Sequence, residues 1–125
     1  MKRGLVLFLV GGLSYNLIEL CWRGRTHWSM TLLGGACFHM IGHIFARFAC
    51  RSRMICCAFS ALAVTGAEFL FGCVVNRLLR WDVWDYSRMP VNILGQVCLL
   101  YSVLWGFLSL PAAWLYRVLQ RRLGV

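Results

Sequence analysis

Four long apolar stretches dominate this sequence of 125 residues and restrict the folds open to it. They cover residues 4–22, 28–46, 54–76 and 93–116. A helix needs about 20 apolar residues to cross the hydrocarbon core of a bilayer, and each stretch comes close to or exceeds that length. We therefore predict an all-α integral membrane protein, in which residues 1–125 form a single transmembrane domain of four helices.

The composition excludes other classes of protein. Hydrophobic residues make up 61% of the chain and charged residues only 14%, whereas a soluble domain has about 25% charged residues. Six Trp, eight Phe and four Tyr argue against a disordered chain. The net charge of +9 comes from basic residues that separate the apolar stretches, so no nucleic-acid partner is predicted.

The distribution of basic residues predicts the orientation of the chain. One side of the membrane, with both termini, carries eight of them: Lys2, Arg3, Arg47, Arg51, Arg53, Arg117, Arg121 and Arg122. The other side carries five: Arg23, Arg25, Arg77, Arg80 and Arg88. The positive-inside rule favours a multi-pass protein of the cell membrane with cytoplasmic termini. The difference is small, so insertion in both orientations stays an alternative.

The connection between the third and fourth stretches has an unusual composition. It alternates aromatic and charged side chains, namely Arg80, Trp81, Asp82, Trp84, Asp85 and Tyr86. Such a mixture suits the headgroup layer of a membrane. We expect an interfacial segment that folds over the outer mouth of the bundle, with Asn92 capping the fourth helix. The alternative is an aromatic anchor that lies outward on the lipid.

Two carboxylates, Glu19 and Glu68, lie inside apolar stretches. A charge at membrane depth is costly unless it faces a partner or a polar cavity. Arg23 follows Glu19 by four residues, so an ion pair at the interface is one explanation for Glu19. No basic residue stands three or four positions from Glu68, and we expect this side chain to face a donor from another helix.

Further polar residues mark the inner faces of the helices. Asn16 shares a helical face with Glu19, while His39 and His43 stand four residues apart in the second stretch. Two imidazoles at this spacing can converge on a metal ion, but a metal needs further ligands. We expect hydrogen bonds within the bundle instead, and we predict neither a metal nor a cofactor.

Several segments carry a family resemblance. They are ELCWRGRTHWSM at residues 19–30, the pair Gly34-Gly35, EFLFGCVVN at 68–76 and WDVWDYSRMPVNILGQ at 81–96. Together they resemble the CmpB-type family of ABC-transporter membrane proteins, which includes small vertebrate relatives, over residues 13–108. The resemblance implies a four-span fold and carries over no substrate or catalytic residue. The arrangement of Glu19 and Glu68 in equivalent helices also suggests a two-helix internal repeat.

These observations lead to a functional hypothesis. We expect a polar cavity in the outer half of the membrane, formed by Asn16, Glu19, Arg23, Arg25, His39, Glu68, Trp81, Asp85, Tyr86 and Asn92. The chain would then be a permease-like or membrane-embedded binding subunit for a small amphipathic or cationic molecule or a lipid headgroup. Its expected partners are the lipid bilayer, a second copy or another membrane subunit, and a separate ATPase, because the sequence has no phosphate-binding GxxxxGK[ST] motif.

Two alternatives stay open. One is an intramembrane enzyme that acts on a lipid or headgroup at the membrane interface, with Glu68 or His39 as acid or base and arginines holding a phosphate. No GxSxG or HExxH motif supports it. The other is a structural subunit of a larger membrane complex, which would leave the two buried carboxylates unexplained.

Overall fold

Four helices form the bundle, as the apolar stretches predict. The computed structural model describes residues 2–24, 26–48, 52–81, 83–86 and 88–123, and at Lys2 and Arg23 it describes the backbone alone. The helices are α1 (Lys2–Arg23), α2 (Trp28–Arg47), α3 (Arg53–Gly72) and α4 (Leu99–Arg122). All four are long and apolar enough to cross a membrane. This confirms the predicted all-α, four-span class.

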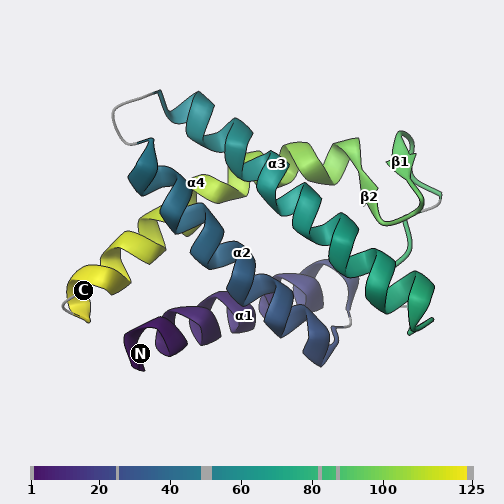
Figure 1. Cartoon of the computed structure of the whole chain (residues 1–125), viewed down its shortest axis with the longest axis horizontal. Coiled ribbons are helices and arrows are strands. Elements are labelled where there is room, and N and C mark those ends of the chain that lie inside the picture. Colours follow the sequence, from purple (N-terminus) through teal and green to yellow (C-terminus); the bar gives the residue numbers. More distant parts are fainter. Residues whose placement is uncertain (1, 25, 49–51, 82, 87, 124–125) are drawn as a thin grey trace.

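The two ends of the bundle differ in what they carry. Figure 1 shows the start of α1, the end of α2, the start of α3 and the end of α4 at one end of the bundle, and the connection from α3 to α4 at the other. We call these the termini end and the hairpin end. Because Glu19 and Glu68 lie in the last turns of α1 and α3, both carboxylates belong to the hairpin half.

Glycines bring α1 and α2 into close contact. A Cβ atom at Gly12 would collide with the backbone carbonyl of Thr31, and one at Gly34 would collide with the side chain of Tyr15. Small residues of this kind allow membrane helices to approach closely. The helices are joined by a short turn in which Gly24 has a φ of 75°, a left-handed conformation that glycine adopts without steric cost.

Helix α2 lies at the centre of the bundle. Its spanning segment is 56% buried within the chain, against 17% for that of α4. Side chains from α2 such as Cys37 and Ile41 pack in one core cluster with Val64 of α3 and Trp84 of the connection. Many apolar side chains on the outer faces of α1 and α4 remain exposed, as expected for surfaces that contact lipid.

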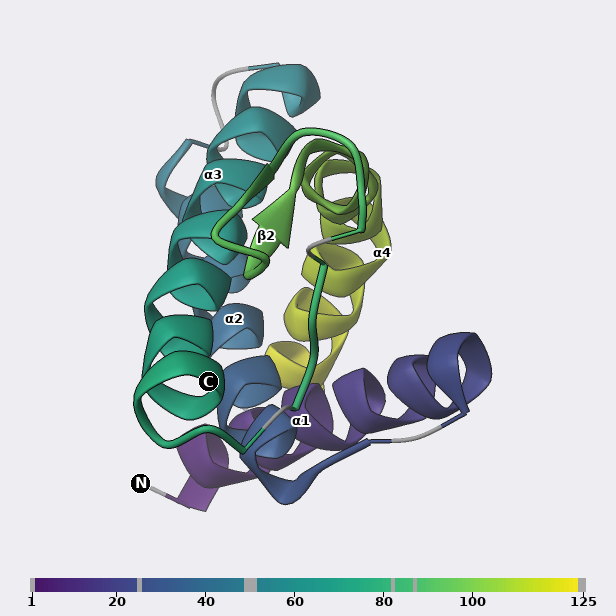
Figure 2. The ribbon, with the colours of Figure 1, turned by 90° about the vertical axis from the view of Figure 1, so that its right-hand side faces the viewer.

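The connection between α3 and α4 begins with a π-helical turn, η1 (Cys73–Leu78), and contains a short hairpin. Strands β1 (Asn92–Ile93) and β2 (Val97–Cys98) pair antiparallel. The fourth helix therefore begins at Leu99 and not near residue 93. Figure 2, which looks onto the hairpin end, shows the connection crossing the ends of α1 and α2 before the hairpin covers the space between α3 and α4.

The prediction that Asn92 caps the fourth helix is wrong. Its side-chain oxygen accepts a hydrogen bond of 3.0 Å from the amide of Gly95, inside the hairpin turn. Leu94 and Gly95 both have positive φ angles, 53° and 71°, so the chain reverses before the helix can start. Cys98 stands at the N-cap of α4 without a side-chain hydrogen bond.

Candidate binding pocket

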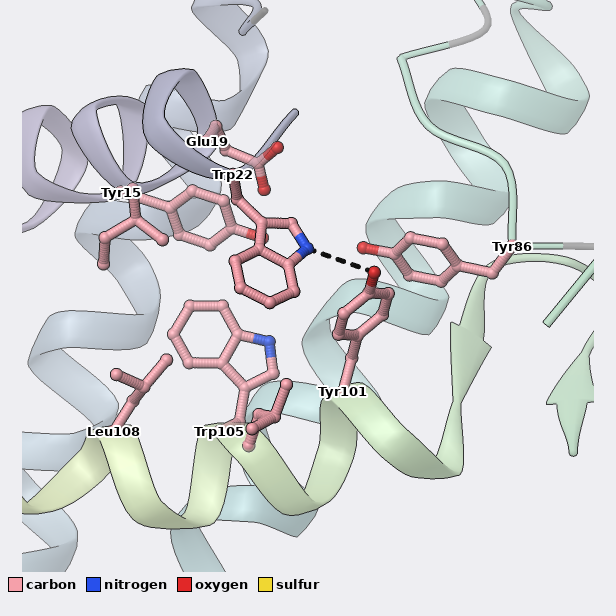
Figure 3. A pocket seen from close by; sticks show the side chains of 9 residues that line it. Tyr15, Glu19, Trp22, Tyr86, Tyr101, Trp105 and Leu108 are labelled. Atoms are coloured by element: carbon pink, nitrogen blue, oxygen red, sulfur yellow. Dashed lines mark hydrogen bonds between the residues drawn. The ribbon is translucent and has the colours of Figure 1, made fainter. Parts of the chain in front are cut away.

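A pocket of about 260 Å³ lies between α1 and α4 in the hairpin half of the bundle (Figure 3). Four of its lining residues stand about one turn apart on a single face of α1, and four more lie on one face of α4. The connection between α3 and α4 contributes one tyrosine. The lining residues are Tyr15, Ile18, Glu19, Trp22, Tyr86, Tyr101, Leu104, Trp105 and Leu108.

Aromatic rings form most of the pocket wall and contact one another across helices. The Trp22 indole N–H donates a hydrogen bond of 3.1 Å to the Tyr101 hydroxyl, and the two rings meet edge to face at 82°. The centroids of Tyr86 and Tyr101 are 5.0 Å apart, and those of Tyr15 and Trp105 are 5.2 Å apart. These contacts hold the rings in fixed positions around the cavity.

Glu19 supplies negative charge to this aromatic wall. Its side chain is only 8% exposed and lines the pocket. Figure 3 shows the carboxylate above the rings of Tyr15 and Trp22, on the side of the cavity formed by α1. The spacing of Tyr15, Glu19 and Trp22 along α1 places all three on one helical face.

Glu68 lies directly behind the pocket wall. It is 3% exposed and accepts a hydrogen bond of 3.5 Å from the Tyr15 hydroxyl of α1. This confirms that Glu68 faces the interior and meets a donor from another helix.

The comparison with known proteins identifies the family. The sequence profile of a family described as "Putative ABC-transporter type IV", CmpB, matches residues 6–123. The chain belongs to the CmpB family. This CmpB match covers the four helices almost from end to end and confirms the resemblance that the sequence carries. No curated protein and no solved structure matches the chain at a significant level. The family name places the chain among ABC-transporter-related membrane proteins and names no ligand.

Other candidate residues of this CmpB chain lie elsewhere. Asn16 donates hydrogen bonds to the Thr26 hydroxyl, at 2.6 Å, and to the His27 carbonyl, at 3.3 Å, and it accepts one of 2.5 Å from the Thr31 hydroxyl. The side chain therefore secures the turn between α1 and α2. It does not line the aromatic pocket.

His39 belongs to the termini half of the bundle. One ring nitrogen lies 3.1 Å from the Tyr116 hydroxyl and the other lies 3.1 Å from the Gly4 carbonyl. The histidine thus joins α1, α2 and α4 through hydrogen bonds, which is the role expected from the sequence. The described residues include no group of three His, Cys, Asp or Glu that could hold a metal ion.

The candidate residues of the connection, which we expected to fold over the outer mouth of the bundle, lie in different environments. Of Trp81, Asp85, Tyr86 and Asn92, only Tyr86 lines the pocket. The Trp81 ring packs 5.7 Å from that of His27 and 5.6 Å from that of Trp28, over the turn between α1 and α2. Asp85 is exposed. The side chain of Arg23 and the whole of Arg25 lie outside the described residues.

An amide network that the sequence hypothesis did not include positions Tyr86. The Asn76 side-chain oxygen accepts hydrogen bonds from the amides of Val83, at 2.7 Å, and Trp84, at 3.3 Å. Its nitrogen donates to the Gln96 side chain at 2.8 Å, and the Trp84 indole donates to the Gln96 carbonyl at 2.8 Å. These contacts fasten both arms of the connection to η1 and thereby place Tyr86 over the cavity.

The aromatic residues of α1 and α4 are also absent from the sequence hypothesis. The signal that could have found them is the one-turn spacing of Tyr101, Trp105 and Leu108 along α4. The same spacing is common in any membrane helix, so it becomes specific only when the facing residues Tyr15 and Trp22 are known.

Proposed function

We propose that this CmpB-family chain is a permease-like, membrane-embedded binding subunit whose aromatic pocket holds an organic cation. Suitable ligands are a small amphipathic amine or the ammonium headgroup of a lipid. The proposal rests on one observation: the Glu19 carboxylate and five aromatic side chains line the same cavity of about 260 Å³. Aromatic faces attract cations, and quaternary ammonium groups are recognised by cages of such rings.

Charge and size both support a cationic ligand. The Glu19 carboxylate lines the cavity itself, and Glu68 lies behind the cavity wall. A carboxylate in the lining attracts a bound cation and repels an anion. The cavity is slightly smaller than the pockets of about 300–1,000 Å³ that take drug-sized molecules, so it suits a compact ammonium group.

The sequence and the family name support a setting for this subunit. With cytoplasmic termini in the cell membrane, the pocket would lie in the outer half of the bilayer. The only lysine of the chain is Lys2, so a phosphate-binding GxxxxGK[ST] loop does not occur in these residues, and an ATPase would be a separate subunit. The exposed apolar faces of α1 and α4 offer surfaces for a second copy or another membrane subunit.

The test is titration of the purified protein with tetramethylammonium in maltoside micelles, which contain no competing ammonium group. We expect saturable binding, and we expect Glu19→Gln to weaken it about tenfold or more because the neutral amide no longer attracts the cation. Trp22→Leu should weaken binding about threefold or more through the loss of one aromatic face.

A matched control separates the pocket from general effects of tryptophan loss. Trp28 is as exposed as Trp22, 63% against 67%, but it does not line the cavity. Trp28→Leu should therefore bind tetramethylammonium as the unaltered protein does. Absence of binding to the unaltered protein, or equal affinity in Glu19→Gln, would overturn the proposal.

A further inference from the structure

A second cavity occupies the opposite half of the molecule. It lies at the termini end, between the C-terminal halves of α2 and α4 and the first turn of α3, and its volume is about 620 Å³. None of its lining residues belongs to the aromatic pocket. The cavity is therefore a separate feature with its own chemistry.

The polar side of this cavity is basic. Arg53 of α3 and Arg117 of α4 line it together with Gln120. Within the described part of the chain, neither guanidinium makes a hydrogen bond or an ion pair, and no carboxylate lines the cavity. Two arginines without a protein counter-charge favour an anionic ligand, and guanidinium groups match phosphate oxygens in geometry.

The opposite side of the cavity is apolar and reaches deeper into the bundle. Leu110 and Ala113 line it on the same helix as Arg117 and Gln120. At 1.5 Å per residue, Leu110 lies about 10 Å from Arg117 along the helix axis, toward the middle of the membrane. The cavity thus offers charge at the membrane surface and an apolar wall below it.

Tyr116 and Gly42 form a tightly packed part of the cavity wall. The Tyr116 ring lies against Gly42, where a Cβ atom would collide with it, and its hydroxyl lies 3.1 Å from a ring nitrogen of His39. Trp114, which is 64% exposed, borders the cavity on the outside of α4. Tryptophan is common at the interface between membrane and water, which supports placing the arginines at headgroup level.

We propose that this cavity is a binding site for the phosphate-bearing headgroup of an anionic lipid. Arg53 and Arg117 hold the phosphate oxygens, Gln120 contacts a neighbouring oxygen of the headgroup, and the lipid chain lies along Leu110 and Ala113. A lipid fits better than a free phosphate ion because the apolar wall continues directly from the basic rim. Basic pockets between membrane helices bind lipid headgroups in this way.

Native mass spectrometry of the purified full chain with added phosphatidylglycerol tests the site. We expect one lipid to be retained in preference to diacylglycerol, which has neither a phosphate nor an ammonium group. The double variant Arg53→Gln and Arg117→Gln should lower the apparent affinity about tenfold or more. The control is Arg121→Gln with Arg122→Gln, which removes the same charge from the same end of the molecule outside the cavity and should change the affinity less than about twofold.

Each outcome decides the proposal. An equal loss of lipid affinity in the two double variants would show that the basic surface attracts anionic lipid in general, and it would overturn a specific site. Displacement of the lipid by inorganic phosphate at comparable concentration would overturn the lipid as the ligand. Tetramethylammonium binding by the Arg53→Gln and Arg117→Gln variant should stay unchanged, so failure of this site and failure of the aromatic pocket are distinguishable.

Discussion

Glu68 shows how one buried carboxylate connects two helices. It lies on α3, and its donor, Tyr15, comes from α1 and lines the pocket. The Glu68 side chain therefore orients a ring that a ligand would touch. The burial of Glu68 was predictable, because no basic residue stands three or four positions from it in the sequence. Its donor was not predictable, since Tyr15 is 53 residues away.

Replacing Glu68 separates its charge from its hydrogen bonds. In Glu68→Gln the amide oxygen still accepts the hydrogen bond from Tyr15, so we expect the thermal midpoint to shift by only a few degrees at most. Tetramethylammonium affinity should fall about tenfold, because the carboxylate behind the cavity wall becomes a neutral amide. Calorimetric titration and thermal unfolding measure both quantities.

Glu68→Leu is the companion variant. An apolar side chain of similar volume removes a costly buried charge, so the bundle should be as stable as the original or more stable, while cation binding is lost. Unaltered affinity in both variants would contradict a role for Glu68 behind the pocket.

Gly12 tests the close packing of α1 on α2. A methyl group there would collide with the Thr31 carbonyl, which belongs to the backbone of α2 and cannot move alone. We expect Gly12→Ala to destabilise the protein by about 1–3 kcal/mol, measured by unfolding in mixed detergent micelles. A methyl group at Gly4, on the same helix, would meet nothing within 4 Å. Gly4→Ala should therefore be neutral or stabilise by up to about 1 kcal/mol.

At the scale of elements, the helices were predictable and the connection was not. Apolar length alone located α1, α2 and α3 to within a few residues, because the membrane requires about 20 apolar residues in each span. The same criterion placed the fourth helix at residues 93–116, six residues before α4 (Leu99–Arg122) at both ends, since residues 93–98 are apolar enough for a helix but belong to the hairpin. That hairpin depends on contacts with η1, and Tyr86 reaches the pocket through them.

Asn76 is the residue that fastens this element. Its side chain accepts from the amides of Val83 and Trp84 and donates to Gln96. Asn76→Ala leaves these groups without their partner, and we expect faster hydrogen exchange at residues 83–98 and a loss of about 2 kcal/mol in the local free energy of opening. Arg77→Ala, an exposed neighbour in the same turn, should leave exchange unchanged. Equal exchange in both variants would contradict this function of Asn76.

At the scale of the whole molecule, the side of the membrane on which the termini lie stays a prediction. The termini end carries more basic residues than the hairpin end, so both termini should be cytoplasmic. A fluorescent protein fused after Val125 should fluoresce, and a periplasmic phosphatase at the same position should be inactive. Fusions after Arg80, behind three spans, should give the opposite pattern. Phosphatase activity alone at Val125 would overturn the assignment.

The position of the aromatic pocket determines how a ligand reaches it. Helix α1 packs mainly on α2, and α3 mainly on α4, while α1 and α4 touch only slightly. Ile18 and Trp22 on the α1 side of the pocket are 43% and 67% exposed, so the cavity opens toward the lipid. A ligand would then arrive by partitioning into the leaflet, and its concentration there would govern occupancy. In liposomes, each added methylene on an alkyltrimethylammonium ion should raise the apparent affinity about fourfold or less, even where it never touches the protein.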